Sequence, residues 1–256
     1  LWYVQVATAL VYVKDQENQS MRTVRIPAVR GSILDAQGRP LAQDRPTYVV
    51  NAYLEELRHH FREEWKNNKP EGKLTDKEST RLEIRVRHRV VKRFTEKLGL
   101  DQAMQISPEK MQHHFRDQRA LPLPVIHELS STNIARFMEN NWKVPGLELE
   151  VTSKRHYPSL SIAHITGHLK RGNSNKKESV RYNYRLPDYM GSLGLEQTFD
   201  NHLRGQPGTR SVLVNNLGYR QSDSILIPPQ AGSNVVLTLD LNIQEATMKA
   251  LNETKG

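Results

Sequence analysis

Two serines in this sequence stand three residues before a lysine, a spacing that suits a nucleophile and its general base. The chemistry needs the lysine one helical turn from a buried serine, so that the amine can accept the hydroxyl proton. Ser107 instead precedes Pro108 at a predicted helix start, and Ser174 lies in a polar loop where Lys177 stays protonated. We therefore predict no catalytic residue in this chain. Acyl transfer through Ser107 or Ser174 remains the alternative hypothesis.

The ten histidines are candidate metal ligands, and cysteine is absent. His164 and His168 are four residues apart, but Gly167 between them should end any helix, and no acidic third ligand lies nearby in sequence. The adjacent pairs His59-His60 and His113-His114 should direct their side chains apart on a helix. We predict no metal site and no cofactor.

A glycine-rich stretch, Gly191 to Gly194, has the composition of a phosphate-binding loop. No lysine follows it, and the carboxylate of Glu196 would repel a phosphate. We interpret the two glycines as a tight entry into a helix. Glu196 is then the acceptor of an internal ion pair, with Arg30 and Arg155 as its candidate partners.

Most of the net charge of +9 lies in one segment. Between Arg58 and Lys97 there are 13 Lys and Arg against seven Asp and Glu, a balance of +6. A solvated helix face and a docking site for a partner protein both explain this pattern. No aromatic residues interleave the basic residues, so we predict no nucleic-acid partner; a basic nucleic-acid-binding protein is the weaker alternative hypothesis. The predicted contact residues form one stripe of a helix: Arg81, Arg85, Arg89 and Lys92.

The helices and strands predicted from the sequence, which must position the candidate residues, indicate a mixed α+β chain. An apolar residue recurs every four positions from Leu82 to Leu98, as in an amphipathic helix. Asp35 and Gly38 predict the turn of a hairpin. The predicted helices cover 55–98 with a loop at 67–77, a segment starting at 108, 131–140, 191–203 and a segment capped by Asp240. The predicted strands cover 47–52, 121–126 at a sheet edge, 147–151, 211–216, 224–227 and 234–239, with a polar loop at 171–187.

The beginning of the chain predicts contact with a membrane surface. Residues 1–13 contain Trp2, Tyr3 and Tyr12, and such aromatic residues suit a membrane–water interface. A buried first helix or strand is the alternative. No stretch reaches the roughly 20 apolar residues of a membrane helix. Because the sequence does not begin with methionine, we expect that a segment upstream of Leu1 has been removed. We expect that segment to hold one hydrophobic helix.

Three collinear segments carry a family resemblance. They are 30–42, with the pattern R-G-x-I-x-D-x-x-G-x-x-L-A; 155–158 and 163–167, with R-x-Y-P and A-H-x-x-G; and 191–196 and 203–208, with G-x-x-G-L-E and L-x-G-x-x-G. Together they resemble the N-terminal module of class B penicillin-binding proteins. Residues 214–216, 228–232 and 237–241 are similar to the penicillin-binding protein 2 group, which serves side-wall elongation.

The resemblance implies an elongated α+β pedestal with an inserted, largely helical head. We assign 1–50 to the membrane-proximal anchor and first pedestal segment, 51–142 to the head and 143–256 to the returning pedestal. In the family, a D,D-transpeptidase domain with the S-x-x-K serine follows this module, so we expect the active site to lie beyond Gly256. The residues of the structural motif are Arg30, Gly31, Asp35, Gly38, Arg155, Tyr157, Pro158, Gly191, Gly194 and Glu196.

The resemblance also implies partners and a cellular location. It suggests a non-catalytic scaffold that positions the transpeptidase domain of its own parent protein. The head would contact an MreC-like scaffold protein and a RodA-like glycosyltransferase. The expected location is the extracytoplasmic side of the bacterial inner membrane.

Overall fold

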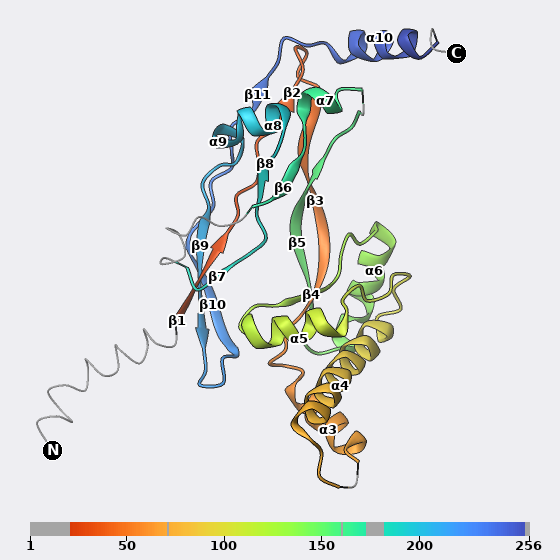
Figure 1. Ribbon diagram of the computed structural model, residues 1–256, viewed down its shortest axis with the longest axis vertical. Coiled ribbons are helices and arrows are strands. Elements are labelled where there is room, and N and C mark those ends of the chain that lie inside the picture. Colours follow the sequence, from red (N-terminus) through yellow and green to blue (C-terminus); the bar gives the residue numbers. More distant parts are fainter. Residues whose placement is uncertain (1–20, 71, 160, 173–181, 254–256) are drawn as a thin grey trace, which may run out of the picture. The chain divides into compact units, whose positions relative to one another are not determined.

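The computed structural model describes residues 21–70, 72–159, 161–172 and 182–253 (Figure 1). The chain forms two compact units. Unit 1 comprises Leu1–Arg45, Ser153–Leu213 and Ser222–Gly256, and unit 2 comprises Pro46–Thr152 and Val214–Gln221. None of the helices in the described ranges is long and apolar enough to cross a bilayer. The predicted interfacial segment, 1–13, lies outside these ranges.

Unit 2 is a helical layer on a small sheet. Its elements are the end of β3 (Pro40–Ala52), α3 (Arg58–Asn68), α4 (Asp76–Lys97), α5 (Pro108–Asp117), β4 (Leu123–Ile126), α6 (Ser131–Asn140), the 3-10 helix η1 (Asn141–Lys143) and the start of β5 (Leu147–His156). The edge strand β4 pairs antiparallel with β3, and β5 also pairs with β3. Apolar residues from all these elements except η1 form one core, to which Tyr219 adds its ring from the second chain segment.

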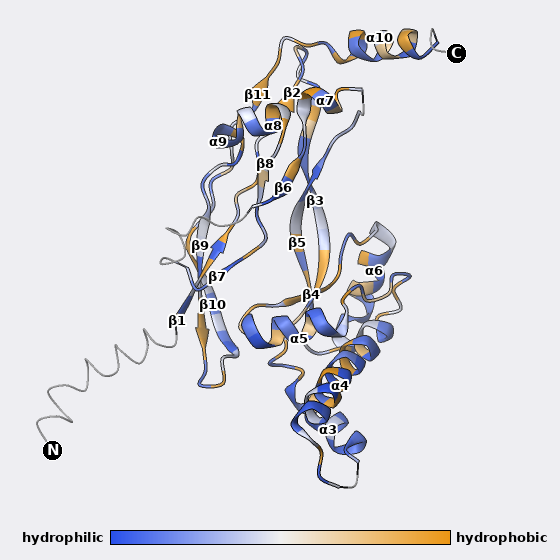
Figure 2. Cartoon of the chain, in the orientation of Figure 1, coloured by the Kyte–Doolittle hydropathy of each residue, from blue (hydrophilic) through white to orange (hydrophobic). Residues whose placement is uncertain are grey.

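The longest helix, α4, follows directly from its sequence. Thr75 and Glu78 form a capping box, in which each side chain accepts a hydrogen bond from the other residue's backbone N–H. The apolar stripe that includes Leu82, Val86 and Val90 is buried. Figure 2 shows hydrophobic and hydrophilic residues alternating around this helix. One face of α4 therefore packs on the core and leaves the charged residues on the others.

Unit 1 is built mainly of short strands. A four-stranded sheet has the order β10-β9-β1-β7, in which β1 pairs antiparallel with β9 and parallel with β7. The strand β2 pairs with β11 and with the start of β3, and β6 pairs with β8. The new elements are β1 (Met21–Ile26), β2 (Ile33–Leu34), α7 (Ala163–Thr166), β6 (Leu169–Arg171), β7 (Tyr184–Arg185), β8 (Tyr189–Gly191), α8 (Gly194–Thr198), α9 (Asp200–Leu203), β9 (Gly208–Val214), β10 (Arg220–Ile227), β11 (Val235–Val236) and α10 (Leu241–Glu253).

The predicted mixed α+β class is confirmed, as are the helices at 131–140 and after Asp240. The predicted continuous helix at 191–203 is wrong. Gly191 ends β8, and the helical residues form two short helices, α8 and α9. A continuous right-handed helix cannot run from Gly191 into α8, because Gly194, where α8 begins, has a φ of +61°. The strand predicted at 234–239 is also shorter, since only Val235 and Val236 pair.

Candidate functional site

A buried ion cluster in unit 1 joins the three motif segments. The carboxylate of Glu196 is fully buried, and the side chains of Arg30 and Arg155 are each 6% exposed. Arg30 Nε donates to Glu196 Oε2 at 2.7 Å, and Arg155 Nε donates to Oε1 at 2.8 Å. The predicted ion pair of Glu196 is thus present with both arginines. One carboxylate ties together residues that are up to 166 positions apart.

Two aspartates extend this cluster. Arg30 Nη1 lies 2.7 Å from Asp200 Oδ1, and Arg155 Nη1 lies 3.1 Å from Asp44 Oδ1. Two guanidinium groups therefore face three carboxylates. Burial and the negative charge of Glu196 together raise the pKa of Tyr157 to about 12, and its hydroxyl donates to Glu196 Oε1 at 3.3 Å. Every charged group of the cluster already has a charged partner.

The small residues of the motif permit close backbone approach around this cluster. The backbone N–H of Gly31 donates to Leu203 O at 2.7 Å. A Cβ on Gly191 would lie 2.0 Å from the backbone oxygen of Glu196. Gly194 has a left-handed φ of +61°. Pro158, the last residue of the R-x-Y-P segment, is exposed. These glycines serve the fold, because their small size lets the segment that carries Glu196 pack closely against the segments of Arg30 and Arg155.

The predicted turn at Asp35 holds the start of the last helix. Its Oδ1 accepts from the backbone N–H groups of Gln37 and Arg39, and Gly38 supplies a φ of +80°. The guanidinium of Arg39 bridges Asp35 and Asp240. Burial by itself raises the pKa of Asp35, but hydrogen bonds from Arg39, from the Gln37 amide and from the Leu241 amide bring it to about 2. Through Arg39, this turn therefore holds Asp240, the residue that caps α10, in place.

Ser107, the candidate nucleophile among the described residues, is not placed for acyl transfer. Ser107 caps α5, where its Oγ accepts from the backbone N–H of Lys110 at 3.3 Å. The Ser107 hydroxyl therefore accepts from the backbone of Lys110, and it is the side-chain amine of Lys110 that would have to act as the general base. Ser174 lies outside the described residues. His164 is in α7, and Gly167 ends that helix with a φ of +76°, as predicted.

The predicted basic stripe lies on the exposed side of α4. Arg81, Arg85, Arg89 and Lys92 are all exposed. Arg89 Nη1 contacts Glu64 Oε1 of α3 at 3.2 Å, and Lys92 Nζ lies 3.8 Å from Glu96. Within the described part of the chain, Arg81 and Arg85 form no ion pair. We call these four side chains the basic face; its first two residues are exposed to solvent, and Arg81 interacts electrostatically with Glu78 one turn earlier.

Unit 2 has a second cationic feature, which was not predicted from the sequence. The rings of Phe115 and Tyr219 alternate with three guanidinium groups. Arg58 lies 4.7 Å from the Tyr219 ring, and Arg87 and Arg119 lie 3.7 Å and 4.5 Å from Phe115. They line a groove of about 550 Å³. No local pattern could predict this stack, because Tyr219 comes from the short segment that returns to unit 2.

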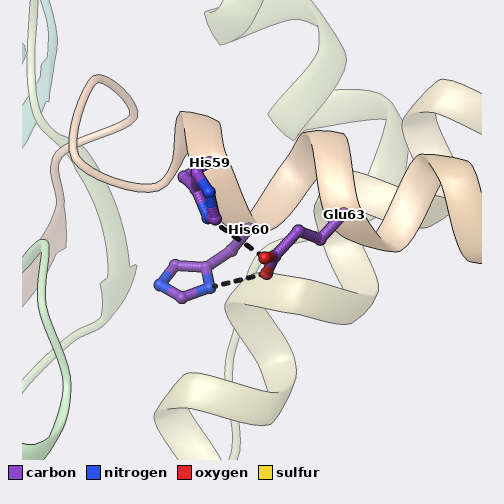
Figure 3. Close-up of side chains that lie close together, drawn as sticks. All are labelled: His59, His60 and Glu63. Atoms are coloured by element: carbon purple, nitrogen blue, oxygen red, sulfur yellow. Dashed lines mark ion pairs between the residues drawn. The ribbon is translucent and has the colours of Figure 1, made fainter.

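The first turns of α3 bring together three possible metal ligands (Figure 3). His59 Nδ1 lies 3.4 Å from Glu63 Oε1, and His60 Nδ1 lies 3.8 Å from Oε2. The prediction that this histidine pair diverges is therefore wrong. Residues three and four positions apart are neighbours on a helix surface, so both rings can reach the same carboxylate.

Comparison with known proteins shows where this fold and its motifs occur. The family described as the penicillin-binding protein dimerisation domain matches residues 25–237. The peptidoglycan D,D-transpeptidase MrdA of Escherichia coli K12 is 27% identical over 251 residues, which cover 96% of this chain and 35% of that protein. The chain thus spans about a third of the length of this curated relative.

Two solved structures share the fold. One concerns the structural coordination of polymerization and crosslinking by a peptidoglycan synthase complex. It is 28% identical, covers 98% of this chain and 36% of its own, and has a TM-score of 0.51. The other is a complex between penicillin-binding protein 2 and MreC from Helicobacter pylori. It is 16% identical, covers 91% and 38%, and has a TM-score of 0.55. At that identity, the second match shows the fold alone.

Proposed function

The chain belongs to the penicillin-binding protein dimerisation-domain family, and on this premise we propose that it is a non-catalytic scaffold and docking module of a peptidoglycan D,D-transpeptidase. The module positions a transpeptidase domain and binds partner proteins of cell-wall elongation in the bacterial envelope. The similarity to MrdA supports the elongation role.

The partners we propose are an MreC-like scaffold protein and a RodA-like glycosyltransferase. The solved structures with this fold include a penicillin-binding protein 2 bound to MreC and a peptidoglycan synthase complex. The proposed head, residues 51–142, falls within unit 2. We assign the docking role to this unit and the structural role to the ion cluster of unit 1, in which each charged group has a charged partner.

The observation that carries the docking role is the basic face of α4. Four cationic side chains lie in a row on one helix, and Arg81 and Arg85 are not neutralised by an ion pair in the described part of the chain. An acidic surface on a partner would supply the missing charge. Such complementarity accelerates association and excludes wrong partners more than it raises affinity. The expected contact is therefore sensitive to ionic strength.

The test measures binding of the chain to the immobilised extracytoplasmic part of an MreC-like protein. Biolayer interferometry monitors the binding. The charge-reversal variant Arg81→Glu/Arg85→Glu should weaken binding about tenfold or more, equivalent to at least about 1.4 kcal/mol. The variant Lys110→Glu/Lys143→Glu has the same change in net charge at exposed sites of unit 2 and should bind like the wild type. Equal losses for both variants would remove the basic face as the docking site.

A further inference from the structure

We propose that His59, His60 and Glu63 bind one transition-metal dication of the zinc class. The site consists of two imidazole nitrogens and one carboxylate on the first two turns of α3 (Figure 3). It is separate from the basic face and does not depend on the docking role.

The two His–Glu spacings are close to those between ligands of a tetrahedral ion. Zinc binds imidazole nitrogen and carboxylate oxygen at about 2.0–2.2 Å, so two such ligands at a tetrahedral angle lie about 3.4 Å apart. His59 Nδ1 and Glu63 Oε1 are 3.4 Å apart, and His60 Nδ1 and Oε2 are 3.8 Å apart. One ligand atom from each of the three side chains falls within a mutual separation of 4.8 Å. Binding of one ion requires the side chains to rotate so that these separations shorten to about 3.4 Å.

One ligand is held in place by the core. The ring of His60 packs edge-on against Phe94, with ring centroids 4.8 Å apart and planes at 77°. Phe94 is itself buried in α4, so this contact restricts the His60 ring. His59 and Glu63 are 77% and 57% exposed and can adjust to the ion. The arrangement is a partly preorganised site that leaves room for water as the fourth ligand.

The donor set selects among cations. Two imidazoles and a carboxylate suit Zn²⁺, Ni²⁺ and Cu²⁺. Mg²⁺ prefers oxygen ligands and retains its water, so it should not compete. The neighbouring positive charges of Arg58 and Arg62 oppose any cation here, which limits the affinity but not the ligand geometry.

The test is calorimetric titration of the untagged 256-residue chain with Zn²⁺, and with Mg²⁺ as the control cation. The wild type should bind one Zn²⁺. His59→Ala and Glu63→Gln should each weaken binding by more than about tenfold, since even loss of an outer-sphere partner costs about 10–100-fold. His113→Ala is the matched control, because His113 Nδ1 lies 3.2 Å from Asp117 in another exposed i,i+4 pair. Circular dichroism spectra should show that all variants remain folded.

Three results would overturn the proposal. They are no Zn²⁺ binding by the wild type, equal binding by the wild type and both site variants, and an equal loss in His113→Ala. Binding of Mg²⁺ with comparable affinity would contradict the assigned ligand class.

Discussion

Replacing Glu196 by glutamine should destabilise unit 1 more than any other single isosteric change in its ion cluster. The substitution keeps the shape but leaves two guanidinium groups, each 6% exposed, without their shared carboxylate. Removing one member of a buried ion pair costs about 3–5 kcal/mol. Asp200 and Asp44 still face Arg30 and Arg155, so we expect the lower end, about 3 kcal/mol. For a chain of this size that corresponds to about 6–12 °C in the midpoint of thermal unfolding.

The assay is thermal unfolding followed by circular dichroism, together with hydrogen exchange measured by mass spectrometry. Glu96→Gln is the matched control, because Glu96 is 64% exposed and pairs with Lys92 at 3.8 Å. Exposed pairs of this kind contribute little to stability, so its midpoint should stay near that of the wild type. In Glu196→Gln, peptides covering α8 and residues 155–158 should exchange faster, and peptides of unit 2 should not change.

Two outcomes would refute this reasoning. If the midpoint of Glu196→Gln equals that of Glu96→Gln, the buried cluster does not stabilise the fold. If exchange increases equally in both units, the effect is not local to the cluster.

Three further predictions concern other parts of the structure. The pKa of Asp35 is lowered to about 2 in the folded chain, so its ionised carboxylate stabilises the fold. This stabilisation is complete above the unfolded-state pKa of about 3.9 and is lost as the pH falls toward 2. Thermal midpoints measured at pH 5 and below should therefore depend less on pH in Asp35→Asn than in the wild type. Phe115→Ala removes a buried ring between two guanidinium groups, and denaturant unfolding should show a loss of about 3–5 kcal/mol. Gly191→Ala forces a Cβ against the Glu196 backbone and should lower the thermal midpoint, whereas Gly172→Ala, whose nearest neighbour would be 3.6 Å away, should not.

The sequence predicted the elements whose signals are local. The apolar repeat of α4 and the cap at Ser107 act within a few residues, and α5 begins where the cap predicts it. The start of α4 was missed, because the predicted loop at 67–77 contains Thr75, which caps that helix. The acceptor role of Glu196 was also predicted locally, because no lysine follows the glycine-rich stretch and the carboxylate would repel a phosphate. Its candidate partners, Arg30 and Arg155, both pair with it.

Other features depend on contacts between distant residues and could not be predicted in this way. Tyr219 joins unit 2 from a segment of eight residues, and only the fold shows that it stacks with Arg58 and Arg119. The histidine pair was misjudged for a different reason. The prediction compared His59 with His60, whereas the relevant relation is the one that each makes with Glu63.

Labelling with a fluorescent penicillin tests the central claim, that this chain folds and docks partners without performing acyl transfer. The 256-residue chain is incubated with the reagent under native conditions and examined by denaturing electrophoresis, with a complete class B transpeptidase as the positive control. We predict a labelled band for the transpeptidase and none for this chain. A covalent adduct on this chain that disappears in Ser107→Ala or Ser174→Ala would contradict the account.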